Sequence, residues 1–98
     1  MSGIYKLWMS KPTDAWYQLS KEEQDGLVAK SREALEKVGG KAILTCTPAW
    51  SSERWLLFGV EEFPDAEAVQ KHAGLLFEID HYRYFEGTSM LGIEWPPS

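Results

Sequence analysis

Residues 55–62 predict a strand that is apolar on both of its faces. Side chains alternate across a strand, and here neither alternating set is polar. One set is Leu56, Phe58 and Val60, and the other is Trp55, Leu57 and Gly59. A sheet with one face in water would show a polar set instead. In a chain of 98 residues, helices can cover one face, but little chain is left for the other. We therefore expect a twofold homodimer in which sheet packs on sheet.

Strand and helix signals follow one another in the order strand, helix, strand, strand, helix, strand. The strands are predicted at 4–9, 42–47, 55–62 and 81–95, and the helices at 20–38 and 65–77. A capping box formed by Ser20 and Glu23 begins the first helix, and Gly39 and Gly40 end it. This order predicts a ferredoxin-like α+β fold, with a four-stranded antiparallel sheet and two helices on one face. We expect a single domain over residues 1–98.

Charge and composition exclude several classes of partner. The net charge is −5, and the ten basic residues are scattered among fifteen acidic ones, which argues against nucleic acid binding. No apolar stretch approaches the length of a membrane helix, so no membrane association is expected. The opening Met-Ser-Gly-Ile shows no secretory signal, and the single Cys46 cannot form an intrachain disulfide, so a cytoplasmic location is expected. Cys46 itself is interpreted as an inert buried thiol.

The chain resembles the dimeric α/β-barrel superfamily, which includes antibiotic-biosynthesis monooxygenases, muconolactone isomerase, stress-responsive barrel proteins and YCII-related proteins. The resemblance rests on the element order, on the passage from strand 55–63 into Pro64-Asp65-Ala66-Glu67-Ala68, and on the aromatic last strand. It implies a ferredoxin-like subunit and a sheet-to-sheet dimer. No subfamily is identified. The heme-degrading branch uses an asparagine, tryptophan and histidine set, and the absence of asparagine from this chain counts against that branch.

Many aromatic side chains lie near segment ends that this fold would bring to one pole. These residues are Trp8, Trp16, Tyr17, Trp50, Trp55, His81 and Tyr82. Tryptophan and tyrosine combine a large apolar face with one polar atom, which suits a flat, weakly polar organic ligand. In one interpretation they form the mouth of a pocket between sheet and helices, with residues 10–19 as a movable lid. In the other, they close a thin core or lie at the dimer interface.

Two histidines are candidates for proton transfer, because histidine titrates near neutral pH. His81 is expected at a strand start among phenols, or alternatively as an exposed residue. His72 follows Val69 by three residues and can face the sheet, either lining a pocket or bonded within the core. Tyr82 and Tyr84 are expected on one strand face, where they would donate to a substrate oxygen or simply contribute packing.

No cofactor and no metal site is predicted. The histidines form neither HxxxH nor HxH, and Gly39-Gly40 lacks the spacing of a nucleotide-binding loop. One hypothesis is a small enzyme acting on an aromatic or polyketide-like compound as a cofactor-independent oxygenase, isomerase, cyclase or dehydratase. The other is a noncatalytic, ligand-binding or stress-related dimer. A roomy cavity containing a histidine would favour the enzyme, and a filled core with exposed histidines would favour the noncatalytic dimer.

Overall fold

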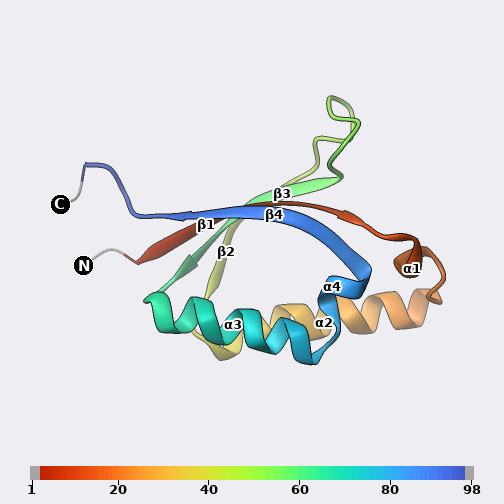
Figure 1. Ribbon diagram of the computed structural model, residues 1–98, viewed down its shortest axis with the longest axis horizontal. Coiled ribbons are helices and arrows are strands. Elements are labelled where there is room, and N and C mark those ends of the chain that lie inside the picture. The colour runs from red at the N-terminus through yellow and green to blue at the C-terminus, as the bar shows by residue number, and fades with distance from the viewer. Residues whose placement is uncertain (1–2, 97–98) are drawn as a thin grey trace.

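The computed structural model describes residues 3–96, which form one antiparallel sheet with its long helices on one face (Figure 1). The elements are β1 (Ile4–Pro12), α1 (Asp14–Tyr17), α2 (Lys21–Lys37), β2 (Lys41–Cys46), β3 (Leu57–Phe63), α3 (Ala66–Glu78), α4 (His81–Tyr84) and β4 (Phe85–Gly92). The strand order is β2-β3-β1-β4. The predicted ferredoxin-like α+β fold is therefore confirmed. None of the helices within residues 3–96 is long and apolar enough to span a bilayer.

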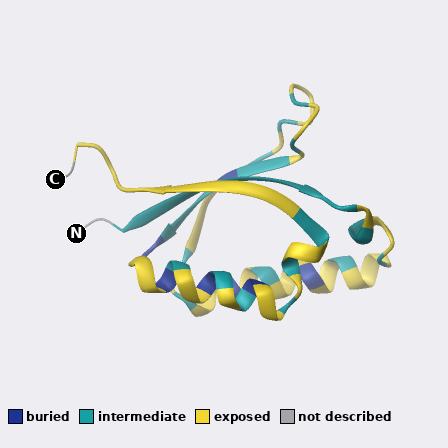
Figure 2. Ribbon diagram, viewed as in Figure 1, coloured by how far each residue is buried: buried dark blue, intermediate teal, exposed yellow. Residues whose placement is uncertain are grey.

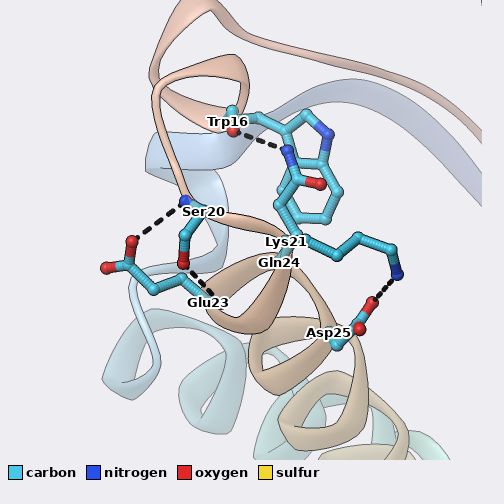
Figure 3. A network of polar contacts seen from close by, with 6 residues as sticks. All are labelled: Trp16, Ser20, Lys21, Glu23, Gln24 and Asp25. Carbon is cyan, nitrogen blue, oxygen red and sulfur yellow. Dashed lines mark hydrogen bonds and ion pairs between the residues drawn. The ribbon is translucent and has the colours of Figure 1, made fainter.

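Local side-chain chemistry begins both long helices, and the capping box of the first was predicted from the sequence. The Ser20 hydroxyl accepts a hydrogen bond from the Glu23 amide at 3.1 Å, and the Glu23 carboxylate accepts one from the Ser20 amide at 3.0 Å (Figure 3). This completes the capping box of α2. The Asp65 carboxylate accepts from the Ala68 amide at 2.8 Å and caps α3. Each cap satisfies a backbone donor that the helix itself leaves unpaired, so the two helix starts are sharply defined.

The last strand, β4, begins at Phe85, four residues later than the sequence predicted. Residues 81–84 form the short helix α4, so His81, Tyr82 and Tyr84 lie on a helical turn and do not share a strand face. Asp80 precedes this turn in the left-handed conformation, with φ 61°. The left-handed residue separates α3 from α4, and the strand begins only after α4, at Phe85.

At the other end of the chain, β1 runs three residues beyond its predicted end, because Lys11 and Pro12 still pair with β4. Residues 10–12, the first part of the predicted lid, therefore belong to the sheet.

The two faces of the sheet differ in composition. In the β1–β3 register, Lys6 lies opposite Glu61 and Trp8 opposite Gly59, and these residues face the helices. The alternate set faces away from the helices and is largely apolar. It comprises Leu7, Met9, Leu44, Cys46, Phe58, Val60 and Met90. Cys46 is half-buried on this outer face, so it is not the buried thiol that the sequence predicted. The exposure of β4 is evident in Figure 2.

The packed core lies at one end of the interface between sheet and helices. Phe63 of β3 has no exposed surface and contacts Leu35 of α2 and Ala68 of α3. Val38 and Val69 complete this cluster. The buried residues of α2 and α3 line the side of each helix that faces the sheet (Figure 2). Away from Phe63 the two layers no longer fill the space between them, and a cavity results.

Candidate functional site

A cavity of about 390 Å³ lies between the inner face of the sheet and the helices α2, α3 and α4. Its surface is mostly apolar, and it opens to solvent on one side. Polar side chains from several elements reach it. They include Lys6 and Trp8 of β1, Ser31 of α2, Glu61 of β3, His72 of α3, His81 and Tyr82 of α4, and Ser89 of β4. An apolar hollow with a few convergent polar groups is the usual form of a small-molecule site.

His72 is the most deeply buried polar residue of the cavity wall. It is 4% exposed, and its ring lies 5.3 Å from the ring of Phe63. Its Nδ1 atom has no hydrogen-bond partner within residues 3–96, so the core histidine bonded to a carbonyl or tyrosine is not what the structure shows. Burial, with a smaller contribution from Lys6, lowers its pKa to about 4. His72 is therefore neutral at neutral pH.

His81 is half-buried on α4 and is oriented by its neighbours. Its Nδ1 atom lies 3.3 Å from the Ser31 hydroxyl, and its ring stacks on Phe85 at 5.0 Å. The Tyr82 ring meets it edge-on at 5.4 Å. Burial, followed by the charge of Lys6, lowers the His81 pKa. A neutral imidazole with one nitrogen held by a hydroxyl is suited to accept or return a proton.

Lys6 and Glu61 are site residues that sequence reasoning missed. They lie opposite each other on β1 and β3, on the helix-facing side of the sheet. Burial raises the pKa of Glu61, although the charge of Lys6 opposes this shift. The pKa of Tyr82 is raised by burial and by Glu61. Their spacing was the signal available in the sequence. Lys6 lies two residues before Trp8, and Glu61 lies two residues after Gly59, so each shares a strand face with a residue that points inward.

Trp8 is the predicted tryptophan that does line the cavity. Its indole lies directly over Gly59, where a Cβ atom would stand 2.8 and 2.9 Å from two indole carbons. A side chain at position 59 would displace the ring, so glycine here makes room for it. The Trp8 Nε1 atom is buried and without a hydrogen-bond partner in the described part of the chain.

The other predicted aromatic residues do not converge on this cavity. Trp16 does not line the cavity and packs against Phe85, which does, with the two ring centres 4.9 Å apart. Tyr17 and Trp55 border a separate shallow hollow, where Arg54 lies 4.9 Å above the Trp55 ring. Trp50 is 88% exposed. The reason is that the connection between β2 and β3 projects from the side of the sheet opposite the helices (Figure 1).

Residues 13–19 of the predicted lid are tied to neighbouring elements. The Thr13 amide donates to the Tyr84 carbonyl at 2.9 Å, and its hydroxyl donates to the Arg83 carbonyl at 2.7 Å. The Gln24 side chain donates to the Trp16 carbonyl at 3.1 Å (Figure 3). Tyr84 is thus held beside α1 and outside the cavity. Through Thr13 the start of α1 is therefore fixed to α4, whose His81 and Tyr82 line the cavity.

The buried neutral His72 predicts a measurable pH dependence of stability. The pKa of His72 is about 4 in the folded protein and about 6.5 in the unfolded chain. Between these pH values the unfolded chain binds a proton that the folded protein does not, so stability is lost as the pH falls from about 6.5 towards 4. We expect wild type to lose about 2 kcal/mol more than His72→Gln over this range, less than the full shift implies because the open cavity screens the charge. Urea denaturation at several pH values checks this. If the free energy of unfolding fell equally with pH in wild type and in His72→Gln, a buried neutral His72 would be contradicted.

Within residues 3–96, no three histidine, cysteine, aspartate or glutamate side chains are grouped so that they could hold a metal ion.

Sequence comparison finds no matching protein-family model and no matching curated protein. The fold, however, is shared with solved structures. Chlorite dismutase from Candidatus Nitrospira defluvii in complex with imidazole matches with a TM-score of 0.73 at 15% identity, over 99% of this chain and 42% of that chain. A double mutant of that enzyme matches with a TM-score of 0.73 at 17% identity, over 100% and 43%.

A second protein assigned as a chlorite dismutase matches with a TM-score of 0.72 at 15% identity, over 94% of this chain and 45% of that chain. The chain therefore spans less than half the length of these similar structures. At this level of identity the likeness concerns the fold. It shows that the chain shares the ferredoxin-like α+β architecture of these structures.

Proposed function

We propose that this protein is a small enzyme that binds an aromatic or polyketide-like compound in the cavity between sheet and helices and moves protons on it. The reaction class is that of a cofactor-independent isomerase, cyclase, dehydratase or oxygenase. The observation that carries the proposal is the joint presence of His72 and His81 in the wall of one roomy cavity. A filled core with exposed histidines would have favoured a noncatalytic protein, and the structure does not have that arrangement.

The chemistry assigned to each residue follows from its state. His81 is neutral because burial lowers its pKa. In the tautomer whose Nδ1–H donates to the Ser31 hydroxyl, Nε2 is the basic nitrogen that takes and returns a proton. Tyr82 stands at the rim with its phenol protonated and can donate a hydrogen bond to a substrate oxygen. Trp8 offers a flat apolar surface against which a planar compound can be positioned. These roles require no further group for a proton transfer.

The experiment is a binding screen followed by an exchange measurement. Quinones, phenols, lactones and polyketide-like acids are titrated while tryptophan fluorescence is recorded in wild type and in Trp8→Phe. A compound that binds in the cavity is expected to quench the tryptophan fluorescence of wild type more strongly than that of Trp8→Phe. Each binder is then incubated with the protein in D₂O, and NMR follows deuterium entering its carbon-bound acidic positions. Catalysed exchange supports the enzyme. Binding without exchange or turnover would instead establish the noncatalytic ligand-binding alternative, and no binding would refute the site.

We also propose that the protein is a homodimer joined through the outer sheet face. The support is the apolar set on that face, in which Leu44 is 54% exposed and Met90 65% exposed. An apolar area of this kind on a soluble chain marks an interface. A second copy covers it symmetrically, because the same face then serves both subunits.

Sedimentation equilibrium at micromolar concentration is expected to give about twice the monomer mass of 11.2 kDa. Phe58→Asp is expected to dissociate the dimer, since a lone carboxylate buried against apolar groups costs several kcal/mol. Phe77→Asp is the matched control, because Phe77 is 71% exposed on α3 and distant from the outer face. A folded wild-type monomer at this concentration would refute the dimer.

A further inference from the structure

Two groups that can only donate hydrogen bonds stand side by side on the cavity floor. Lys6 and Trp8 are two residues apart on β1, so both side chains lie on the same face, about 7 Å apart along the strand. The lysine ammonium and the indole N–H have no acceptor capacity. Within residues 3–96, the Trp8 Nε1 atom has no hydrogen-bond partner and Lys6 makes no ion pair, although Glu61 lies opposite it.

A third polar group in the cavity wall is also without a partner. His72 is 96% buried, being 4% exposed, and its Nδ1 atom forms no hydrogen bond in the part of the chain that the structure describes. Buried polar atoms are normally paired, and an unpaired one is explained by a water or a ligand that completes it. Two such atoms, Trp8 Nε1 and His72 Nδ1, border one hollow beside Lys6. The indole N–H can only donate, so its partner must be an acceptor from outside the chain.

The charged groups around the cavity favour an anion. Lys6 is the positive charge of the floor, and Arg32 adds a second on the α2 rim. Of the two carboxylates, Glu86 is exposed and lies 4.0 Å from Lys11. The other, Glu61, is the single acidic group of the floor, and burial raises its pKa, so it takes up a proton more readily than an ordinary glutamate. The neutral His72, His81 and Tyr82 complete the lining.

We infer that the cavity selects compounds with an acceptor-only anionic oxygen, a carboxylate or a deprotonated enol or phenol, which lies beside Lys6 and accepts the Trp8 indole N–H. This inference rests on the proposed function and names the ligand class of the same site. Lys6 is then the specificity-determining residue, and the apolar remainder of the ligand lies against Leu57 and Phe85. The anion pairs with the partly buried charge of Lys6, which forms no ion pair with Glu61.

The test compares two probes that share one flat body, 2-naphthoate and 2-naphthamide, by isothermal titration calorimetry. Wild type is expected to bind the carboxylate about tenfold more tightly than the amide, because a charge-assisted hydrogen bond contributes at least this much to affinity. Lys6→Met is expected to bring this ratio close to one, whereas Lys6→Arg retains most of it. Lys71→Met is the matched control with an unchanged ratio, because Lys71 is 67% exposed on α3 and outside the cavity. Circular dichroism verifies that each variant is folded.

Equal affinity for the two probes in wild type, or an unchanged ratio in Lys6→Met, would overturn the inference and leave the proposed function standing. Tighter binding of (2-naphthyl)methylammonium than of 2-naphthoate would also overturn it and assign selection to Glu61. If none of the three probes binds, the inference fails, and the compound panel of the preceding section decides the proposed function separately.

Discussion

Phe63→Ala is expected to lower the free energy of unfolding by about 3 to 5 kcal/mol, as loss of a fully buried aromatic ring does. Phe63 has no exposed surface, and it joins β3 to both long helices through Leu35 and Ala68. The packed cluster is small because the cavity occupies much of the remaining interface between sheet and helices. Few other apolar contacts can compensate for the missing ring. Urea denaturation followed by circular dichroism measures the loss.

The matched control for this variant is Phe77→Ala on α3. Phe77 is 71% exposed and touches the Tyr82 ring at 4.8 Å, so a loss below about 1 kcal/mol is expected. If Phe63→Ala does not fold, Phe63→Leu provides the measurement, with a smaller loss because most of the volume is kept. Equal losses at positions 63 and 77 would show that the core does not lie where the structure places it.

His81→Gln is expected to reduce turnover by about two to four powers of ten, while binding of the same compound changes little. Glutamine keeps a polar group near Ser31 but cannot exchange a proton near neutral pH. The loss corresponds to about 3 to 5 kcal/mol in the activation barrier. The pH profile supplies a second readout. Because burial lowers the His81 pKa, the wild-type enzyme is expected to keep a basic imidazole below the usual range of histidine.

Tyr84→Phe is the control for this change. Tyr84 lies on the same short helix as His81 but outside the cavity, so turnover is expected to stay within about twofold of wild type. Unimpaired turnover in His81→Gln would remove His81 from the chemistry. A parallel loss of binding and of helical signal in that variant would instead assign it a structural role.

The fold was predictable because its signals are local. The capping box at Ser20, the helical period of residues 65–77 and the apolar strand at 55–62 each depend on a few neighbouring residues. Their order along the chain was enough to identify the topology. The boundaries that failed depend on distant pairing. β1 extends to Pro12 because β4 lies beside it. The short helix α4 follows the left-handed residue Asp80, and the sequence of neither segment indicates these boundaries.

The site was predictable only in part, since its composition depends on register and depth. His72, His81, Tyr82 and Trp8 were singled out by residue type, and all four line the cavity. Charges in strands usually face solvent, so Lys6 and Glu61 were passed over, and only the pairing of β1 with β3 shows that they face the helices. Trp50 was included for its position in a connection, whose direction away from the helices no local pattern encodes.

A crystal structure of the protein soaked with the tightest-binding compound of the panel tests the central claim, a ligand site between sheet and helices, most directly. Difference density is expected in the 390 Å³ cavity, in contact with Trp8, His72 and His81. Repeating the soak with His81→Gln checks that the pose survives loss of the imidazole. A cavity filled by the protein's own side chains, or a compound bound only in the hollow beside Trp55, would contradict the site.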